Sequence, residues 1–282
     1  MEIKIVSIIG GGTMGNGITH IFAMKGFYVN LVEMSEQLFN HAYTIITENL
    51  NRQVKKLIIT ETEKNTILKR INKVISIDNI PANSDVVIEA IYENKEAKIA
   101  IFKKINQLVK QDSIFASNTS SISITELAAS CRPDRFIGMH FMNPVPIMKL
   151  VEIVRGYSTS DQTFTTVKEL SQKLDKVPVE VSDYPGFISN RILIPMINEA
   201  IFALMEGLSC KEDIDTVMKL GMNHPMGPLT LADFIGLDIC LAIMEVLYNG
   251  YNDSKYRPCP LLKKMVAAGK LGRKSGEGFY KY

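Results

Sequence analysis

One histidine of this sequence stands where an imidazole and a carboxylate can be brought together for acid–base chemistry. His140 closes an apolar segment, and a proline-rich stretch separates it from a second segment, 148–154, in which apolar and polar residues alternate. Glu152 lies on the apolar face of that second segment, where an unpaired carboxylate costs several kcal/mol. If the two segments form a hairpin centred near Pro146, His140 and Glu152 lie opposite each other. The carboxylate would then orient the imidazole and stabilise its protonated form, as a general base requires.

The alternative is an ordinary buried hydrogen bond between these two side chains. The other three histidines, His20, His41 and His224, fall in expected helices or a loop and are interpreted as structural or exposed. The four cysteines form no CxxC pair, and no histidine lies at a zinc-ligand spacing from one of them. We therefore expect no metal site, and reduced thiols in a cytoplasmic protein.

A glycine-rich turn is the second candidate for chemistry, since residues 10–15 (GGGTMG) fit the pattern G-x-G-x-x-G. Gly10 permits a tight turn, Gly12 lets the backbone approach a pyrophosphate, and Gly15 allows close helix–strand packing. A β-branched apolar run precedes the turn and helical spacing follows it, so free N–H groups of the helix would face the phosphates. A merely flexible loop is the alternative. The predicted cofactor contacts in the turn are Gly10, Gly12, Thr13, Met14 and Gly15.

An acidic residue, Glu33, ends the next strand, where a carboxylate accepts hydrogen bonds from the adenosine ribose hydroxyls. Such a carboxylate repels a 2′-phosphate, and the following Met34 and Ser35 supply no arginine for one. The cofactor predicted from these residues is therefore NAD rather than NADP. A solvated glutamate at a strand end is the alternative interpretation.

The elements that must position these residues alternate between strands and helices. We expect strands at 3–9, 27–32, 85–90, 113–117, 136–141, 148–154 and 178–181, with helices at 13–25, 35–56, 61–71 and 95–109. This alternation predicts an α/β fold, a Rossmann-like, doubly wound and mostly parallel sheet.

After Tyr184-Pro185-Gly186 the signals become almost all helical, which predicts an NAD-binding domain at 1–184 and an all-helical domain at 185–282. In the second domain, Ser209 and Glu212 fit a capping box, with Gly221 placed to end that helix. Pro195 interrupts a helical pattern, so we expect a kink there or a helix that starts nearer to it.

Composition limits the class of protein. The chain has 282 residues, nearly half of them apolar, and its 32 basic and 30 acidic side chains give a formal net charge of +2. A balance of this kind offers no broad electrostatic footprint for nucleic acid or an anionic membrane. The apolar runs are too short and too interrupted to cross a bilayer, so we expect neither nucleic acid nor a membrane among the partners.

With these motifs in place, the sequence resembles the (S)-3-hydroxyacyl-CoA dehydrogenase family over essentially its whole length. The resemblance is carried by GGGTMGNGI at 10–18, VIEAIYENKEAK at 87–98, ASNTSS at 116–121, GMHFMNPVPIMKLVEIV at 138–154, PGFISNRIL at 185–193, HPMGPLTLADFIGLD at 224–238 and GRKSGEGFYKY at 272–282. Three positions depart from the family pattern: Met142 stands where Phe is usual, Glu33 where Asp is usual, and Gly11 where Ala is common.

The resemblance implies reversible hydride transfer between a 3-hydroxyacyl-CoA and NAD, with the substrate in a cleft between the two domains. It implies that His140 is the catalytic base, that Glu152 is its partner, that Ser120 holds the 3-oxygen of the substrate and that Asn190 contacts the reacting acyl group. The family's remaining cofactor contacts fall on Glu33, Glu93, Lys98, Asn143 and Lys274. Local alternatives are a serine turn at Ser120, a helix cap at Asn190 and a local ion pair between Glu93 and Lys98.

The segment 49–56 matches the family's CoA-binding helix, which assigns Asn49, Arg52 and Lys56 to the CoA moiety, with Lys55 beside them. A solvated charged face is the alternative.

Rival functions are an NADP-preferring or free-acid hydroxyacid dehydrogenase, and a non-catalytic NAD-binding structural protein. The last predicts a damaged set of His140, Glu152 and Asn190, and all three are present. We expect a homodimer through apolar faces of the helical domain around 197–208 and 229–247, with internal core as the alternative for those faces.

Overall fold

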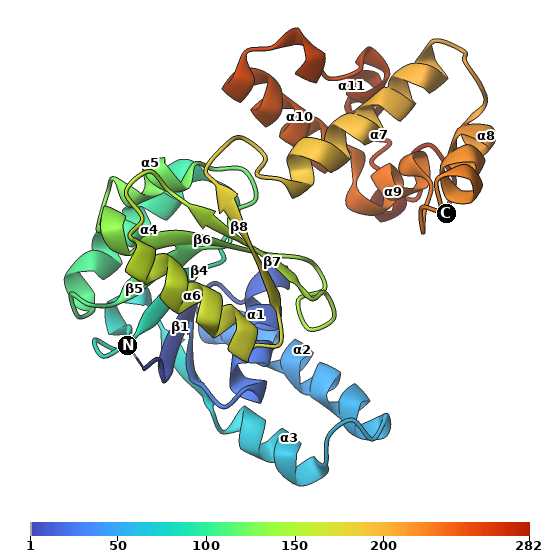
Figure 1. The fold of residues 1–282 in the computed structure, drawn as a ribbon. Helices are drawn as coiled ribbons and strands as arrows, with labels where there is room; N and C mark the ends of the chain where they lie inside the picture. The colour runs from blue at the N-terminus through green and yellow to red at the C-terminus, as the bar shows by residue number, and fades with distance from the viewer. Residues whose placement is uncertain (1) are drawn as a thin grey trace. The chain divides into compact units, whose positions relative to one another are not determined.

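The computed structural model describes residues 2–282, which form two compact units. The first unit ends at Asp183 and the second is Tyr184–Tyr282, drawn in yellow to red in Figure 1. In the described part of the chain, every helix is too short or too polar to span a membrane.

The first unit is built on one eight-stranded sheet with the strand order β3-β2-β1-β4-β5-β6-β7-β8 (Figure 1). The strands are β1 (Ile5–Ile9), β2 (Tyr28–Glu33), β3 (Ile71–Ile75), β4 (Val86–Glu89), β5 (Ile114–Ser117), β6 (Phe136–Phe141), β7 (Leu150–Arg155) and β8 (Val177–Ser182). Every neighbouring pair is parallel except β6 and β7. The order reverses between β1 and β4, so the predicted doubly wound, mostly parallel sheet is confirmed.

Six helices connect these strands: α1 (Thr13–Met24), α2 (Glu36–Lys55), α3 (Glu61–Leu68), α4 (Lys95–Leu108), α5 (Ile124–Ala128) and α6 (Asp161–Lys173). Short 3-10 turns lie at Ile77–Asn79 and Pro133–Arg135. The expected helix at 61–71 ends earlier than predicted, because Ile71 already begins β3. The strand β3 and the helices α5 and α6 were not predicted from the sequence.

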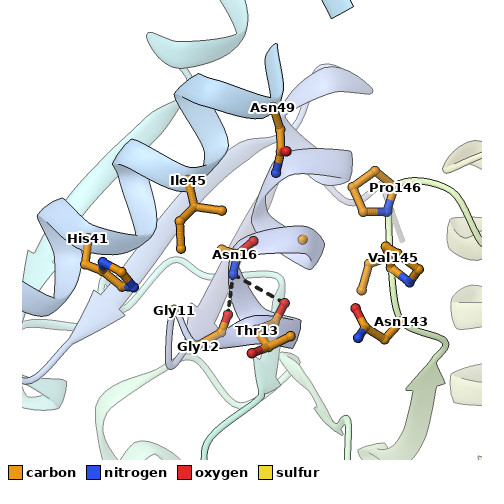
Figure 2. Close-up of a pocket in the computed structure, with 12 residues that line it drawn as sticks. Gly11, Gly12, Thr13, Asn16, His41, Ile45, Asn49, Asn143, Val145 and Pro146 are labelled. Atoms are coloured by element: carbon orange, nitrogen blue, oxygen red, sulfur yellow. Dashed lines mark hydrogen bonds between the residues drawn. The ribbon is translucent and has the colours of Figure 1, made fainter. Parts of the chain in front are cut away.

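The turn between β1 and α1 shows why glycine is needed there. A Cβ on Gly15 would overlap the carbonyl oxygen of Gly10, whereas one on Gly12 would meet no atom within 4 Å. The Asn16 side chain donates hydrogen bonds to the carbonyl oxygens of Gly12 (2.6 Å) and Thr13 (3.3 Å), drawn as dashed lines in Figure 2. These contacts hold the first turn of α1 in place above the end of β1.

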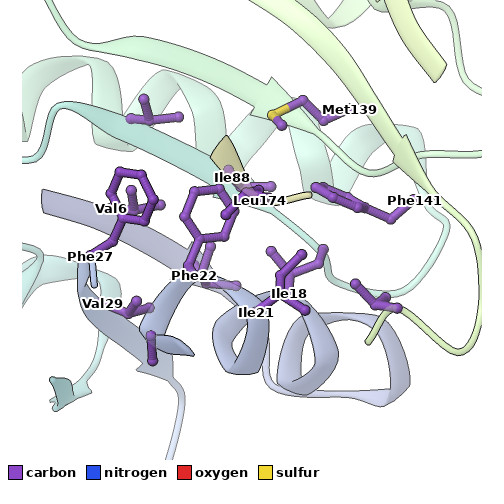
Figure 3. Close-up of a cluster of buried hydrophobic side chains, with 14 of the residues drawn as sticks. Val6, Ile18, Ile21, Phe22, Phe27, Val29, Ile88, Met139, Phe141 and Leu174 are labelled. Atoms are coloured by element: carbon purple, nitrogen blue, oxygen red, sulfur yellow. The ribbon is translucent and has the colours of Figure 1, made fainter. Parts of the chain in front are cut away.

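The core beneath this turn is apolar and continuous (Figure 3). Ile18 and Phe22 of α1 pack with Val6 and Ile8 of β1, and Met139 and Phe141 of β6 belong to the same cluster. Since successive side chains of a strand point to opposite faces, His140 points away from this cluster, to the other face of the sheet.

The second unit contains α7 (Ser189–Met205), α8 (Lys211–Thr216), α9 (Pro228–Ile235), α10 (Leu237–Tyr251) and α11 (Pro260–Ala267), with 3-10 turns at Ser254–Tyr256 and Arg273–Ser275. Three local predictions need correction or refinement. The Ser209–Glu212 capping box is wrong: Cys210 is the N-cap of α8 and makes no side-chain cap bond. Pro195 lies inside α7, which begins well before it, and Gly221 ends a π-helical turn, Val217–Gly221, that follows α8.

Part of the face that we expected to be available for dimerisation is internal core. Ile197, Ile201, Leu229 and Leu247 are all fully buried within the second unit. Their burial follows from packing among α7, α9 and α10. Other apolar residues of the same ranges are exposed, among them Leu208 and Phe234, and so are Val217, Leu220 and Met222 between the two ranges.

Candidate active site

The carboxyl ends of four parallel strands bring two predicted residues, Gly10 and His140, to one edge of the sheet together with two that were not predicted, Glu89 and Ser117. Gly10 follows β1, Glu89 ends β4, Ser117 ends β5 and His140 lies one residue before the end of β6. The strand register pairs Ile9 with Glu89 and Glu89 with Ser117. This edge, next to the point where the strand order reverses, is where ligands of open α/β sheets bind.

The histidine and the carboxylate predicted to face each other are adjacent in the antiparallel ladder of β6 and β7. His140 pairs with Glu152 in the register, and the distance from His140 Nδ1 to Glu152 Oε2 is 2.7 Å. Both residues are buried, Glu152 being 2% exposed. Because a carboxylate only accepts, Nδ1 carries the proton and Nε2 is the basic nitrogen of the neutral ring. The hairpin geometry predicted by counting is confirmed.

The loop that carries Ser120 is organised by the carboxylate of Glu93. Glu93 Oε1 accepts hydrogen bonds from the backbone N–H groups of Ser120 (3.1 Å) and Ser121 (3.2 Å), and also from the hydroxyls of Thr119 and Ser121. Burial raises the pKa of the Glu93 carboxyl, but the Lys98 ammonium and these hydroxyls outweigh burial and hold the pKa below its ordinary value. Glu93 therefore stays charged at neutral pH.

Lys98 is part of a buried ionic group rather than a surface pair. Its ammonium lies 2.6 Å from Glu89 Oε1 and 3.2 Å from Glu93 Oε2, and its side chain is 1% exposed. The local ion pair that we had weighed for Glu93 and Lys98 is present, with Glu89 as a third member. A direct contact of Glu93 or Lys98 with the cofactor stays a prediction.

The glycine turn fits a dinucleotide. A cavity of about 410 Å³ opens at the N-terminus of α1, lined by Gly11, Gly12, Thr13, Asn16, Gly17, His41, Ile45, Asn49, Asn143, Pro144, Val145 and Pro146 (Figure 2). The open space at Gly12 and the first backbone N–H groups of α1 suit the close approach of a pyrophosphate. Asn143, predicted as a cofactor contact, lies on the opposite wall of this cavity.

Glu33 bends back onto the turn. Its Oε1 accepts a hydrogen bond from the Gly11 N–H, and its Oε2 accepts one from Met34 N at 3.2 Å. A Cβ on Gly11 would lie 2.6 Å from the Cβ of Ala42 and 3.0 Å from Glu33 Oε1. The two departures from the family pattern at positions 11 and 33 are thus in contact with each other.

The predicted CoA residues lie along the second half of α2. Asn49 lines the cavity at the glycine turn, and Arg52 Nη1 donates a hydrogen bond to Asn49 Oδ1 at 3.2 Å. Arg52 is well exposed, and Lys56 is the C-cap residue of α2. The cavity also reaches His41, an exposed residue one turn before Ile45.

The second unit holds two further predicted residues. Asn190 lies in the first turn of α7. Lys274 Nζ lies 2.6 Å from the carboxylate of Asp238, at the start of α10. Their roles toward substrate and cofactor stay predictions.

Four residues that build this edge were not predicted from the sequence. Asn118 Oδ1 accepts the Phe141 N–H at 3.1 Å, and Ser117 donates its hydroxyl to Glu89 Oε2 at 2.6 Å. Lys176 donates to the carbonyl oxygens of Val145 and Met148, in the turn after β6. Glu89 carried a usable signal, because it is a carboxylate at the end of the apolar run 86–89, as Glu152 is a carboxylate within one.

Comparisons with known proteins agree over both units. The family model described as 3-hydroxyacyl-CoA dehydrogenase, NAD binding domain, matches residues 5–184, and the model of the C-terminal domain of the same family matches residues 186–282.

Individual relatives cover nearly the whole chain. The chain is 55% identical to the probable 3-hydroxybutyryl-CoA dehydrogenase of Deinococcus radiodurans, over 98% of this chain and 99% of that one. It is 53% identical to the probable 3-hydroxybutyryl-CoA dehydrogenase of Bacillus subtilis, over 100% and 98% of the two chains. The crystal structure of (S)-3-hydroxybutyryl-CoA dehydrogenase from Ralstonia eutropha is similar with a TM-score of 0.97 at 52% identity, covering 100% of this chain and 99% of that chain.

Proposed function

The chain belongs to the 3-hydroxyacyl-CoA dehydrogenase family, and from that premise we propose that it catalyses the reversible, NAD-dependent oxidation of (S)-3-hydroxybutyryl-CoA to acetoacetyl-CoA. The observation that carries this proposal is the buried His140–Glu152 pair, 2.7 Å apart, at the sheet edge that also carries the dinucleotide turn. A positioned base beside a hydride acceptor is what oxidation of a secondary alcohol requires.

In this mechanism His140 Nε2 takes the proton of the 3-hydroxyl group while the hydrogen on C3 leaves as hydride. Bound NAD⁺ supplies the hydride acceptor. Glu152 keeps the ring in one orientation and stabilises the imidazolium that forms. In the reverse direction His140 returns the proton to the 3-oxygen, so protons and electrons balance in both directions.

We assign the substrate contacts to Ser120, which holds the 3-oxygen, and to Asn190, which contacts the reacting acyl group. Asn49, Arg52 and Lys56 bind the CoA moiety through their polar or cationic groups on α2. The positive charges of α2 support this assignment, because CoA carries phosphates.

We assign NAD to the glycine turn, with Glu33 toward the adenosine ribose and Glu93, Lys98, Asn143 and Lys274 as further cofactor contacts. The carboxylate of Glu33 beside the Gly11 N–H supports NAD over NADP, since a 2′-phosphate there would meet a negative charge.

We further propose a homodimer formed through the helical unit. Leu208 and Leu220 are 79% and 80% exposed, and a cavity of about 520 Å³ lined mostly by apolar side chains lies beside Leu208. Exposed apolar patches of this kind favour association. A cytoplasmic location is proposed because Cys131, Cys210, Cys240 and Cys259 are all free thiols.

A substrate and cofactor exchange tests the function. Purified protein should oxidise NADH with acetoacetyl-CoA and do so much more slowly with NADPH or with free acetoacetate. Preference for acetoacetate would favour a free-acid dehydrogenase, and preference for NADPH would overturn the role of Glu33. Tight NADH binding with no turnover of any CoA substrate would leave only a non-catalytic NAD-binding protein.

A further inference from the structure

A fully buried carboxylate, Glu89, lies at the centre of the sheet edge without a part in the chemistry described so far. The residue is 0% exposed. Its Oε1 accepts hydrogen bonds from the Ile91 N–H (2.7 Å) and the Lys98 ammonium (2.6 Å), and its Oε2 accepts one from the Ser117 hydroxyl (2.6 Å). Three donors thus hold both oxygens of Glu89 in fixed positions.

From Glu89 two routes of contact reach the loop that carries Ser120. Along the first, Lys98 bridges Glu89 and Glu93, and Glu93 accepts the N–H groups of Ser120 and Ser121. Along the second, the Ser117 hydroxyl that donates to Glu89 also accepts the Thr119 N–H at 3.2 Å.

The same loop is joined to the strand that carries the base. Asn118 N donates to the Glu89 carbonyl oxygen at 2.8 Å, and Asn118 Oδ1 accepts the N–H of Phe141, the residue after His140. The Ser120 loop and His140 therefore share one rigid hydrogen-bonded frame, and Glu89 lies at its base.

A buried ionic group is a costly way to stabilise a fold, because desolvation offsets most of the attraction between the charges. A well-packed apolar group would stabilise the strand ends as well or better. Fixed geometry is the advantage of a fully hydrogen-bonded charge network, since each partner is held at one distance and angle. Fixed geometry is also what a residue that holds a substrate oxygen needs.

We propose that Glu89 is a positioning residue of this enzyme, which acts through Lys98–Glu93 and through Ser117 to hold the Ser120 loop in its reactive position. This inference rests on the proposed function of Ser120. Because Glu89 is fully buried, the proposed role is exerted through these partners and not by direct contact with the substrate.

A double-mutant cycle tests the proposal. The kcat/KM for acetoacetyl-CoA at saturating NADH is measured for the wild type, Glu89→Gln, Ser120→Ala and the double variant. We expect Glu89→Gln to lower kcat/KM about 10- to 100-fold in the wild-type background, as a misplaced contact does. In the Ser120→Ala background we expect it to lower kcat/KM less than about threefold, because the two residues act as one unit.

Two results would overturn the positioning role. One is an equal loss from Glu89→Gln in both backgrounds, which is the mark of a purely structural residue; the other is no loss in the wild-type background. If Ser120→Ala leaves the rate unchanged, the role of Ser120 in the proposed function fails, and the positioning role of Glu89 fails with it. If Ser120→Ala lowers kcat/KM but Glu89→Gln does not, the role of Ser120 stands and only the positioning role of Glu89 fails.

Glu36→Gln is the matched control, because Glu36 also pairs with a lysine, Lys73 at 2.5 Å, but on the surface. We expect its kcat/KM to stay within about twofold of the wild type, as surface pairs contribute little. If Glu89→Gln does not fold, because Lys98 stays charged and buried, Ser117→Ala replaces it in the cycle. This variant removes one of the two routes without a change of charge, and the same comparison between backgrounds then decides.

Discussion

At the scale of single residues, carboxylates rather than cations organise the candidate site. Glu152 fixes the ring of His140 through Nδ1, Glu93 gathers the N–H and hydroxyl donors of the Ser120 loop, and Glu33 accepts the N–H of Gly11. In each of these contacts a charged carboxylate accepts from the donor, so its replacement by an amide leaves the donor with a weaker acceptor. We therefore expect that substitution of any of these three carboxylates changes the reaction rate or the ligand affinity more than it changes the stability of the fold.

The variant Glu152→Gln tests the role of the Glu152 carboxylate toward His140. Glutamine keeps the size of the side chain and an oxygen for Nδ1–H, but it has no charge to stabilise an imidazolium. We expect kcat to fall about 100-fold while the Kd for NADH changes little, because only the protonated ring of the reaction loses stabilisation. Stopped-flow turnover and NADH fluorescence titration measure the two quantities. A fall in affinity with an unchanged kcat would assign Glu152 to cofactor binding instead.

His20 supplies a pH prediction away from the chemistry. Burial in α1 lowers the pKa of His20 from 6.5 to about 4, and among residues 2–282 no group hydrogen-bonds its Nδ1. The unfolded chain therefore binds a proton between these two pH values while the folded chain does not. The contribution of His20 to the free energy of unfolding is therefore fully present above pH 6.5. It is lost as the pH falls toward 4, by up to roughly 3 kcal/mol.

We expect His20→Leu to lose that part of the pH dependence, as measured by urea unfolding at intervals between pH 7 and pH 4. The exposed His41 provides the control, since His41→Leu should keep the wild-type slope. If His20→Leu also keeps it, another group is responsible for the loss of stability in acid.

Residue pairs within one hairpin could be predicted from the sequence, and networks between elements could not. The two-residue period of strands is enough to place Glu152 opposite His140. No such period links Glu89, Lys98 and Ser117, because their contacts depend on the order in which β4, α4 and β5 pack. Local signals therefore located the base and its partner but not the network that supports Ser120.

At the scale of elements, the β1–α1 turn separates a packing requirement from a binding requirement. Gly15 has no room for a Cβ because of the Gly10 carbonyl oxygen, whereas Gly12 faces open space. Gly15→Ala should therefore lower both the Tm and NADH affinity, the latter at least about tenfold, because overpacking shifts the turn. Gly12→Ala should weaken NADH binding with little change in Tm. Calorimetry and fluorescence titration of both variants check this; equal Tm losses would contradict the assignment of the open side to the ligand.

Element boundaries show where local patterns mislead. The helical spacing continued through Ile71, yet β3 begins there because pairing with β2 overrides helix propensity. Ser209 and Glu212 have the spacing of a capping box, but α8 starts one residue later than that box requires. The doubly wound, mostly parallel character of the sheet, by contrast, agrees with the alternation of strands and helices in the sequence.

At the scale of the whole molecule, the helical unit should associate with a second copy. Leu208→Glu together with Leu220→Glu places charges on the exposed apolar residues and should leave a monomer of 31.5 kDa, while the wild type sediments at about twice that mass. Sedimentation velocity measures both. Tyr157→Glu, a change at an exposed aromatic residue of the first unit, should leave the mass unchanged. A wild-type monomer would remove the proposed dimer.

The most direct test of the account is the rate of His140→Gln with NADH and acetoacetyl-CoA, measured beside its affinity for NADH. We predict that kcat falls on the order of 10²- to 10⁴-fold, while the Kd for NADH stays within about twofold, because the ring acts on the substrate proton and not on the cofactor. A kcat equal to that of the wild type would contradict the account and remove His140 from its role as the base.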